Sequence, residues 1–396
     1  MKTENIYIRV SGHLEKKRDI YQVILNWKDI TGKRCRKSIS TRLPAKGNKK
    51  RAEDILNDKR SKLECELNRK FKTVNAQQIL FADFLEGWLD FVKTDLKPTT
   101  LGNHQNTVRR IIGPYFRERQ ISLANLTSDA ILDFYAFKTS HVKATTIHKY
   151  HNLLSRALKY AVEKELIEYS PMSKVKRPKP ERFVGKFLRE SEIKQLLEAA
   201  KGHKLEIGII LGAYYGLRRS EIVGLRWESI DFDKNTITIE HSVTVAKVDG
   251  QKRIIESDTL KTKSGYRTLP LIQEFRNKLL SLKQEQERYR KLCGNSYNKT
   301  ESKYIYIDPL GNRIKPDYLT AEFPLFMEKN GFRRIRFHDL RHSCASLLLA
   351  NGVSLKQIQE WLGHSSYKIT ADIYSHLDFS SKIETANVLA RINTDM

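Results

Sequence analysis

The spacing of apolar residues changes twice along the chain. Near its start, three short runs of β-type residues separated by turn residues predict strands over 5–10, 20–27 and 35–40. The next stretch, 48–70, spaces its apolar residues along one helix face. We therefore expect a three-stranded sheet backed by one helix in residues 1–75, and such a sheet can lie on a DNA groove.

Residues 76–170 have helical periodicity throughout. Their aromatic and aliphatic stripes are typical of the core of a helix bundle. The second helix is expected to open at Pro98 and to end at Gly113-Pro114. The four predicted helices cover 79–94, 97–116, 128–140 and 144–167.

The pattern becomes mixed α and β from residue 187 onward. Strands that form a small antiparallel sheet are predicted over 236–245, 252–257 and 265–271, with a further strand over 304–308. The predicted helices cover 187–201, 204–227 with a break at Gly216, 271–292 and three segments after residue 315.

A basic segment with three prolines, 171–186, separates the last two regions. Proline blocks both helix and ladder hydrogen bonds, so an extended linker is expected there. The chain is therefore predicted to be a multidomain protein, mainly α with small antiparallel sheets. Its parts are a three-stranded domain with one helix over 1–75, a helical domain over 76–170, the linker, and an α+β domain with a C-terminal tail over 187–396.

The charge balance points to a polyanionic partner. The chain has 72 lysines and arginines against 46 acids, a net charge of +26. Nucleic acid is favoured over acidic membranes, and a basic surface kept only for solubility is the bland alternative. Residues 1–75 carry 21 lysines and arginines against nine acids. The candidate DNA contacts are Lys33, Arg34 and Arg36 in this region, and Lys143, Lys149 and Arg156 on the fourth helix of the bundle.

Several classes of protein are disfavoured. There is no apolar run of 18 residues and no apolar leader, so a soluble intracellular protein without a membrane partner is expected. The scattered cysteines predict reduced thiols and neither a zinc site nor a disulfide framework. No phosphate-binding glycine loop and no acidic cluster suited to Mg²⁺ occurs, which predicts no cofactor and no metal.

The densest chemistry lies between residues 336 and 377. His338 and Arg341 are three positions apart, so both can face one ligand near a helix N-terminus. His364 follows a Leu-Gly helix stop, and Tyr374 comes ten residues later. A guanidinium suits a phosphate, an imidazole moves protons, and a phenol can attack, which together suggest covalent phosphoryl transfer.

Earlier residues can complete this site. Gly216 ends an apolar helix, so Arg218 is held on a short turn, and Glu221 is spaced to support its guanidinium. A lysine beside the Ser264-Gly265 turn could give a proton to a leaving oxygen. Lys263, next to the turn, is preferred to Lys261.

These residues resemble the tyrosine recombinases, also called phage-type integrases. The resemblance rests on the order Arg218, Lys263, His338, Arg341, His364 and Tyr374, and on the strings YGLRRSEIVGLRW, FHDLRHSCASLLLANG and EWLGHSSYKITADIYSHL. It covers the catalytic domain over about 187–390 and the helical core-binding domain over 79–170. Residues 1–75 resemble the arm-binding domain of integrases from phages and conjugative transposons.

The resemblance implies a covalent mechanism. Tyr374 would attack a DNA phosphate and leave a 3′-phosphotyrosine link and a free 5′-hydroxyl. Arg218 and Arg341 would hold the nonbridging oxygens and offset the charge of the transition state. Neither ATP nor a metal is needed, because the phosphotyrosine conserves the bond energy.

Three further roles follow from the same resemblance. Lys263 would protonate the leaving 5′-oxygen, His338 would help to take the tyrosine proton, and His364 would bond a phosphate oxygen. Neighbours of the same type, Arg219, His342 and Tyr367, fit the family phasing less well.

The implied function is site-specific recombination that integrates and excises a mobile element. The implied partners are core-type and arm-type DNA attachment sites, further copies of the chain in a homotetramer, an excisionase and host DNA-bending proteins, in the bacterial cytoplasm at the nucleoid. The segment 380–392 could dock on a neighbouring protomer or in cis. A type IB topoisomerase-like enzyme and a non-catalytic DNA-binding regulator are the alternatives, and phage and conjugative element are left open.

Overall fold

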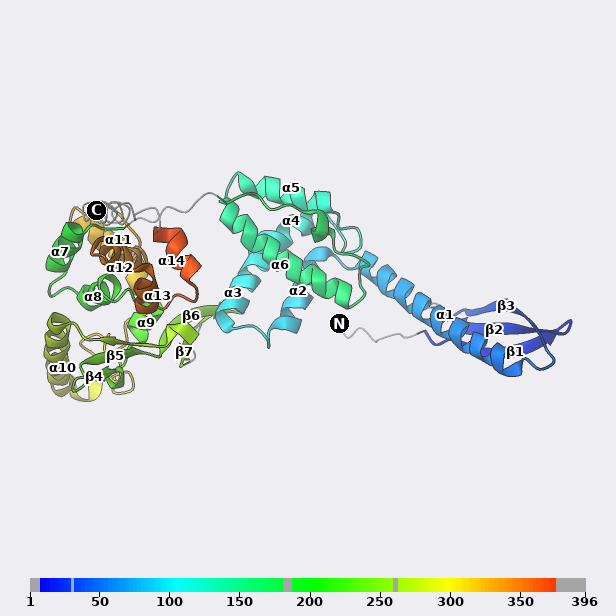
Figure 1. Ribbon diagram of the computed structural model, residues 1–396, viewed down its shortest axis with the longest axis horizontal. Coiled ribbons are helices and arrows are strands. Elements are labelled where there is room, and N and C mark those ends of the chain that lie inside the picture. Colours follow the sequence, from blue (N-terminus) through cyan, green and yellow to red (C-terminus); the bar gives the residue numbers. More distant parts are fainter. Residues whose placement is uncertain (1–7, 30–31, 181–186, 259–262, 375–396) are drawn as a thin grey trace, which may run out of the picture. The chain divides into compact units, whose positions relative to one another are not determined.

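Two units make up the fold, Met1–Glu181 and Arg182–Met396, and each is described by itself. The computed structural model describes residues 8–29, 32–180, 187–258 and 263–374 (Figure 1). The described chain is mostly helical with small antiparallel sheets, as predicted. No helix within these ranges is both long and apolar enough to cross a membrane.

The first unit begins with an antiparallel sheet in the order β1-β2-β3, formed by Ser11–Lys17, Ile20–Lys28 and Arg34–Pro44. The predicted first strand over 5–10 is wrong for residues 8–10, because β1 is the polar stretch that follows, and residues 5–7 lie outside the described residues. Residues 8–10 instead bond to the neighbouring helix: the amides of Ile8 and Val10 donate to the side chains of Asn68 and Glu64, both at 2.9 Å. A polar edge strand gives no hydrophobic signal, which explains the error.

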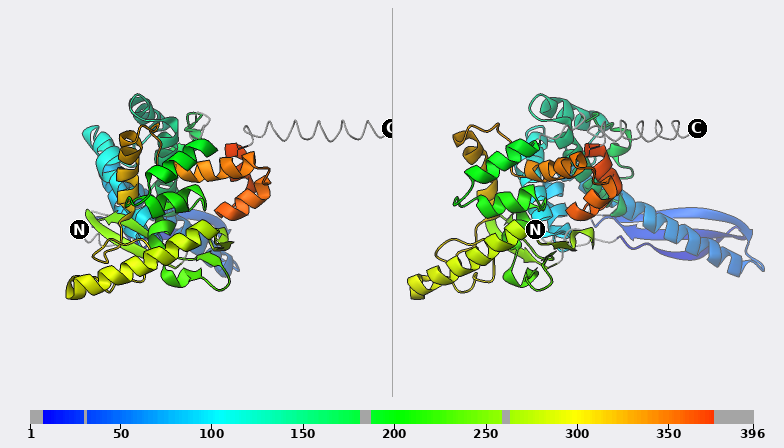
Figure 2. Two further views of the ribbon diagram at one scale, coloured as in Figure 1. Left: turned by 90° about the vertical axis from the view of Figure 1, so that its left-hand side faces the viewer. Right: turned by 60° about the vertical axis from the view of Figure 1, so that its left-hand side comes forward.

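Helix α1 (Lys49–Gln78) packs along one face of this sheet (Figures 1 and 2). Val23 and Leu25 of β2 meet Leu63 of the helix, and Gly12 lets the helix approach closely, since a Cβ there would lie 2.8 Å from Leu56 Cδ1. Strand alternation puts polar residues on the opposite face. These include Gln22, Arg34, Arg36 and Ser38.

The rest of the first unit is a helical bundle with an aromatic core that includes Phe81, Phe116 and Phe134. The second predicted helix does not end at Gly113-Pro114. A π turn at Val108–Ile112 widens the helix, and the Gly113 amide donates to Val108 O, so the chain continues past Pro114. The helices are α2 (Phe81–Val92), α3 (Pro98–Thr107), α4 (Gly113–Glu118), α5 (Ser128–Thr139) and α6 (Ala144–Glu163).

The segment predicted as an extended linker is folded over its first part. Pro171–Lys174 form a 3₁₀ turn, and the side chains of Met172 and Val175 are buried in the bundle core. His148 Nε2 lies 2.6 Å from Pro178 O on the same segment. Apolar residues three apart can cover a bundle even beside prolines, so the extended interpretation was wrong for this part.

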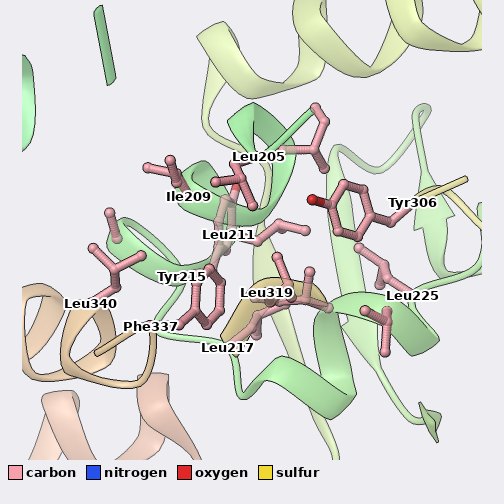
Figure 3. Close-up of a cluster of buried hydrophobic side chains, with 14 of the residues drawn as sticks. Leu205, Ile209, Leu211, Tyr215, Leu217, Leu225, Tyr306, Leu319, Phe337 and Leu340 are labelled. Carbon is pink, nitrogen blue, oxygen red and sulfur yellow. The ribbon is translucent and has the colours of Figure 1, made fainter. Parts of the chain in front are cut away.

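Helices surround a large apolar core in the second unit. Residues on α8 (Glu206–Ala213), α9 (Arg219–Gly224) and α11 (Pro316–Lys329) meet there (Figure 3). Phe337 and Leu340, at the start of α12 (Asp339–Ala350), anchor that helix on α8. The remaining helices are α7 (Glu190–Ala199), α10 (Gln273–Cys293), α13 (Leu355–Leu362) and α14 (Tyr367–Tyr374).

The described strands of the second unit form two small sheets in place of the single one predicted. One has the order β4-β5-β8, and the other is the hairpin β6-β7. The predicted strand over 236–245 is broken before residue 242, and 304–308 makes only isolated bridges, because its buried tyrosines and isoleucine serve the helical core. The strands are Ile230–Asp231, Thr236–Ile239, Ser242–Val248, Gln251–Ser257 and Arg267–Pro270.

A pair of helical glycines tests the packing of α9 on β6. A Cβ at Gly224 would lie 2.9 Å from Ser242 Cα, whereas a Cβ at Gly87 meets nothing within 4 Å. Gly224→Ala is expected to destabilise the second unit by about 1–3 kcal/mol. Gly87→Ala should be neutral or stabilise the first unit by up to about 1 kcal/mol, because alanine favours helix. Calorimetric unfolding of the full chain measures both, and equal effects would contradict this packing.

Candidate active site

Two arginines converge on the end of α13. Arg218 precedes α9, after Gly216 with φ 60°, and its Nη2 donates to Gly363 O at 3.1 Å. Arg341, on α12, donates to Leu362 O at 2.7 Å and to Gly216 O at 2.6 Å. Consecutive carbonyls at one helix end therefore hold the two guanidinium groups near each other.

A buried carboxylate joins this pair to a third arginine. Glu221, 3% exposed, accepts from Arg218 Nη1 at 2.5 Å and from Arg267 Nη2 at 3.0 Å. It also accepts from the Arg218 amide at 3.1 Å, which fixes the start of α9. The contact between Glu221 and the Arg218 guanidinium is the one expected from their three-residue spacing.

The electrostatics of this cluster favour an anion. Burial alone would raise the pKa of Glu221, but the Arg267, Arg218 and Arg341 charges hold the pKa of that carboxyl below its ordinary value. One ionised carboxylate thus bonds to two guanidinium groups and lies near a third, so the local charge is positive. A phosphate oxygen would find preorganised donors and a favourable potential here.

His338 directly precedes α12, and its side chain is exposed. Desolvation by the surrounding protein, His342 and Arg341 lower the pKa of His338 to about 4. The His338 and His342 rings meet edge to face, with centroids 5.5 Å apart, and His342 is buried behind. The accessible imidazole is therefore that of His338.

His364 lies directly after Gly363 and is 9% exposed. Its Nδ1 is 2.9 Å from Oγ1 of the buried Thr370. Burial, with the nearby Arg341 and Arg218 charges, lowers the pKa of His364 to about 3. The ring is thus neutral at neutral pH and oriented by a hydroxyl.

The turn that carries Lys263 meets the same helix end. Lys263–Gly265 form a 3₁₀ turn, and a Cβ at Gly363 would lie 2.6 Å from Ser264 O. Gly363 has φ 68° and ends α13 in the left-handed conformation. The structure describes Lys263 by its backbone alone, and the alternative, Lys261, lies outside the described residues.

Tyr374 is the last residue of α14, the helix that follows His364, and is described by its backbone alone. The alternative, Tyr367, begins that helix and is half exposed. Arg219, the alternative to Arg218, bonds instead to Thr320 Oγ1 at 2.7 Å. The segment 380–392 lies outside the described residues.

The candidate DNA contacts lie on two separate surfaces of the first unit, and all are exposed. Arg34 and Arg36 lie on the sheet face opposite α1, with Lys33 just before β3. Lys143, Lys149 and Arg156 line α6 and the residue before it. His148 and His151, on the same helix, bond to Pro178 O and the Tyr135 hydroxyl, so they serve the bundle.

Arg267 and Gly363 were not singled out from the sequence as site residues. Arg267 has a side chain only 6% exposed and bonds to Glu221. An arginine at the start of a short strand is ordinarily exposed, so the pattern carries no sign of this burial. Among the residues described, no three histidine, cysteine, aspartate or glutamate side chains come together as a possible metal site.

Comparison with known families agrees with this arrangement. Residues 186–381 match the phage integrase family, and residues 80–177 match the phage integrase SAM-like domain. The chain belongs to the phage integrase family of tyrosine recombinases. It is therefore an enzyme that breaks and rejoins DNA in site-specific recombination.

Similar proteins span nearly the whole chain. A XerC-like tyrosine recombinase of Caldanaerobacter subterraneus is 28% identical over 96% of this chain and 98% of its own. The ICEBs1 integrase of Bacillus subtilis is 26% identical, over 87% and 94%. A probable integrase of prophage ps2 in Lactococcus lactis is 28% identical, over 84% and 87%.

Solved structures share the fold. The Tn1549 transposon integrase in complex with a circular intermediate DNA superposes with a TM-score of 0.63 at 17% identity, over 78% of this chain and 99% of that chain. A λ integrase dimer bound to a core site gives 0.53 at 16% identity, over 90% and 93%.

The lowered pKa of His364 predicts a pH-dependent stability. An unfolded histidine binds a proton near pH 6.5, whereas the folded ring resists protonation down to about pH 3. The contribution of neutral His364 to the free energy of unfolding is therefore fully present above pH 6.5 and is lost as the pH falls from 6.5 toward 3. His364→Gln is expected to flatten the drop in the melting temperature of the second unit between pH 7 and pH 5, by a few degrees. Parallel calorimetric profiles of the two proteins would contradict this.

Proposed function

We propose that this recombinase is the integrase of a mobile element, phage or conjugative, and that Tyr374 is its nucleophile. The observation that carries the proposal is the convergence of Arg218, Arg341 and His364 on the end of α13, the helix just before that of Tyr374. A phosphate held by the two guanidinium groups would be presented to the last turn of α14.

The proposed reaction is a transesterification. The Tyr374 oxygen attacks the phosphorus, a phosphorus–oxygen bond to the tyrosine forms, and the bond to the 5′-oxygen breaks. His338, neutral at pH 7, accepts the tyrosine proton, and Lys263 gives a proton to the leaving 5′-oxygen. Attack by the 5′-hydroxyl of another strand reverses these steps and joins the strands.

Arg218 and Arg341 supply the electrostatic part of catalysis. Negative charge builds on the nonbridging oxygens in the transition state, and donors fixed in advance stabilise it without reorganisation. If Thr370 donates to His364 Nδ1, then His364 Nε2 carries the proton and can donate to the phosphate. Exchange of one phosphodiester for another conserves bond energy, so the reaction needs no ATP.

Two basic surfaces of the first unit would hold the DNA. The sheet face with Arg34 and Arg36 fits an arm-type site, because a strand face can lie in a groove. The exposed cations of α6 fit the backbone of the core-type site. We further propose a homotetramer on DNA, an excisionase and host DNA-bending proteins as partners, in the bacterial cytoplasm at the nucleoid.

The nucleophile can be tested with a nicked duplex that carries an attachment site of the element. The nick lets the cleaved fragment leave, so a covalent protein–DNA adduct accumulates. Wild type should form the adduct and Tyr374→Phe should form none, since the phenyl ring has no oxygen to attack. Denaturing electrophoresis of labelled DNA measures it.

Tyr367→Phe is the matched control, because Tyr367 begins the same helix and is half exposed. This variant should retain adduct formation at close to the wild-type rate. An adduct that persists in Tyr374→Phe but disappears in Tyr367→Phe would exchange their roles. No adduct with any native site in wild type would reject the proposed chemistry.

The sheet face can be tested by salt dependence. The double variant Arg34→Ala with Arg36→Ala should weaken binding to arm-type DNA and reduce the slope of log affinity against log salt by about 2, one for each lost phosphate contact. Lys59→Ala with Arg60→Ala removes the same charge from exposed positions on α1 and serves as the control. Equal losses in both would show a nonspecific charge effect.

A further inference from the structure

We propose that Arg267 is a positioning residue, which holds the turn bearing Lys263 in register with Arg218 and His364. The inference rests on the proposed function, because it takes Lys263 as the proton donor. Arg267 begins β8, four residues after Lys263, and it does not itself face the reacting phosphate in this assignment.

The side chain of Arg267 bonds to three separate segments. Its Nη1 donates to Gly265 O at 3.0 Å, within the lysine turn. Its Nε donates to Trp361 O at 2.9 Å, near the end of α13. Its Nη2 donates to Glu221 at 3.0 Å, the carboxylate that also holds Arg218.

These contacts require the planar fork of a guanidinium. The three acceptors lie in different directions around one side chain that is only 6% exposed. A lysine ammonium could neutralise Glu221 but would present its donors from a single nitrogen. Charge compensation and positioning of the turn can therefore be separated by substitution.

A second contact holds the turn on the same helix end. Gly363 has no Cβ, and the space a Cβ would take lies 2.6 Å from Ser264 O and 3.0 Å from Arg267 Nη1. The turn thus lies directly against Gly363, whose carbonyl accepts from Arg218 and which directly precedes His364. The hydrogen bond from Arg267 to Gly265 O and the close approach of Gly363 to Ser264 O together set the position of the turn.

Proton transfer is sensitive to this placement. A general acid must lie within hydrogen-bond distance of the oxygen that it protonates, and a shift of about 1 Å can cost a factor of about 100. The Arg267 guanidinium joins the turn to α13 and to Glu221, the partner of Arg218, and so keeps that distance while the DNA enters. The phosphate-binding arginines and the acid then move as one group.

The test compares two nicked substrates, one with the normal 5′-oxygen and one with sulfur in its place at the bridging position. A thiolate leaves without a proton, because the pKa of a thiol is about 8.5. A defect in the proton donor therefore disappears with the sulfur substrate. A defect in folding or in the phosphate-binding arginines remains.

Arg267→Lys keeps the positive charge beside Glu221 and loses the fork. Its cleavage of the oxygen substrate should fall about 10–100-fold, and its cleavage of the sulfur substrate should stay within about 3-fold of wild type. Lys263→Ala should show the same pattern with a larger loss, and Lys261→Ala should behave as wild type.

Arg313→Lys is the matched control. Arg313 is also 6% exposed and pairs with Glu256 and Glu301, away from the catalytic cluster. Arg313→Lys should change the cleavage rates of the oxygen and sulfur substrates by the same factor. If Arg267→Lys fails to fold, Arg267→Gln takes its place, because it also lacks the fork that bonds three segments, and it should lose more on the oxygen substrate than on the sulfur substrate.

Equal losses of Arg267→Lys on both substrates, or no loss on either, would overturn the positioning role. If Lys263→Ala is rescued by sulfur and Arg267→Lys is not, only this inference fails. If Lys263→Ala is not rescued, the assignment of Lys263 as the acid fails, and the positioning role falls with it. A covalent adduct that depends on Tyr374 would still support the rest of the proposed function.

Discussion

The ionised carboxylate of Glu221 is the interaction on which the site depends. A buried guanidinium without a counter-charge would be expelled toward water, because transfer of an unpaired ion into protein costs several kcal/mol. Glu221 offsets the charge of Arg218 and Arg267 at once, and it also bonds the backbone at the start of α9. One carboxylate thus lets Arg218, Arg267 and Arg341 lie close together, and the excess positive charge of the cluster favours an anion.

The surrounding fold holds this cluster in place. The apolar core beneath α8, α9 and α12 fixes the helices that carry Arg218 and Arg341, and the carbonyls at the end of α13 fix the side chains. A chain with a net charge of +26 can then draw in a polyanion through its exposed surfaces, since the first unit presents cations on the sheet and on α6.

Local patterns predicted the parts of the fold that depend on neighbours in sequence. The amphipathic helices and the Arg218–Glu221 contact both depend on residues a few positions apart. The burial of Arg267 and the bridge between Tyr304 and Arg226 depend on distant segments. The first strand was missed for a different reason, since an exposed edge strand has no hydrophobic pattern.

Gly363 shows how strictly one backbone position can be constrained. Its left-handed φ of 68° excludes most side chains, and the carbonyl of Ser264 excludes even a methyl group. The backbone constraint and the steric constraint are independent, so no single compensating substitution elsewhere can relieve both. The exposed cations of the first unit face no such steric limit, whereas this position stays closed to change. A new target specificity would therefore be acquired at the periphery of the enzyme, with its chemical centre left unaltered.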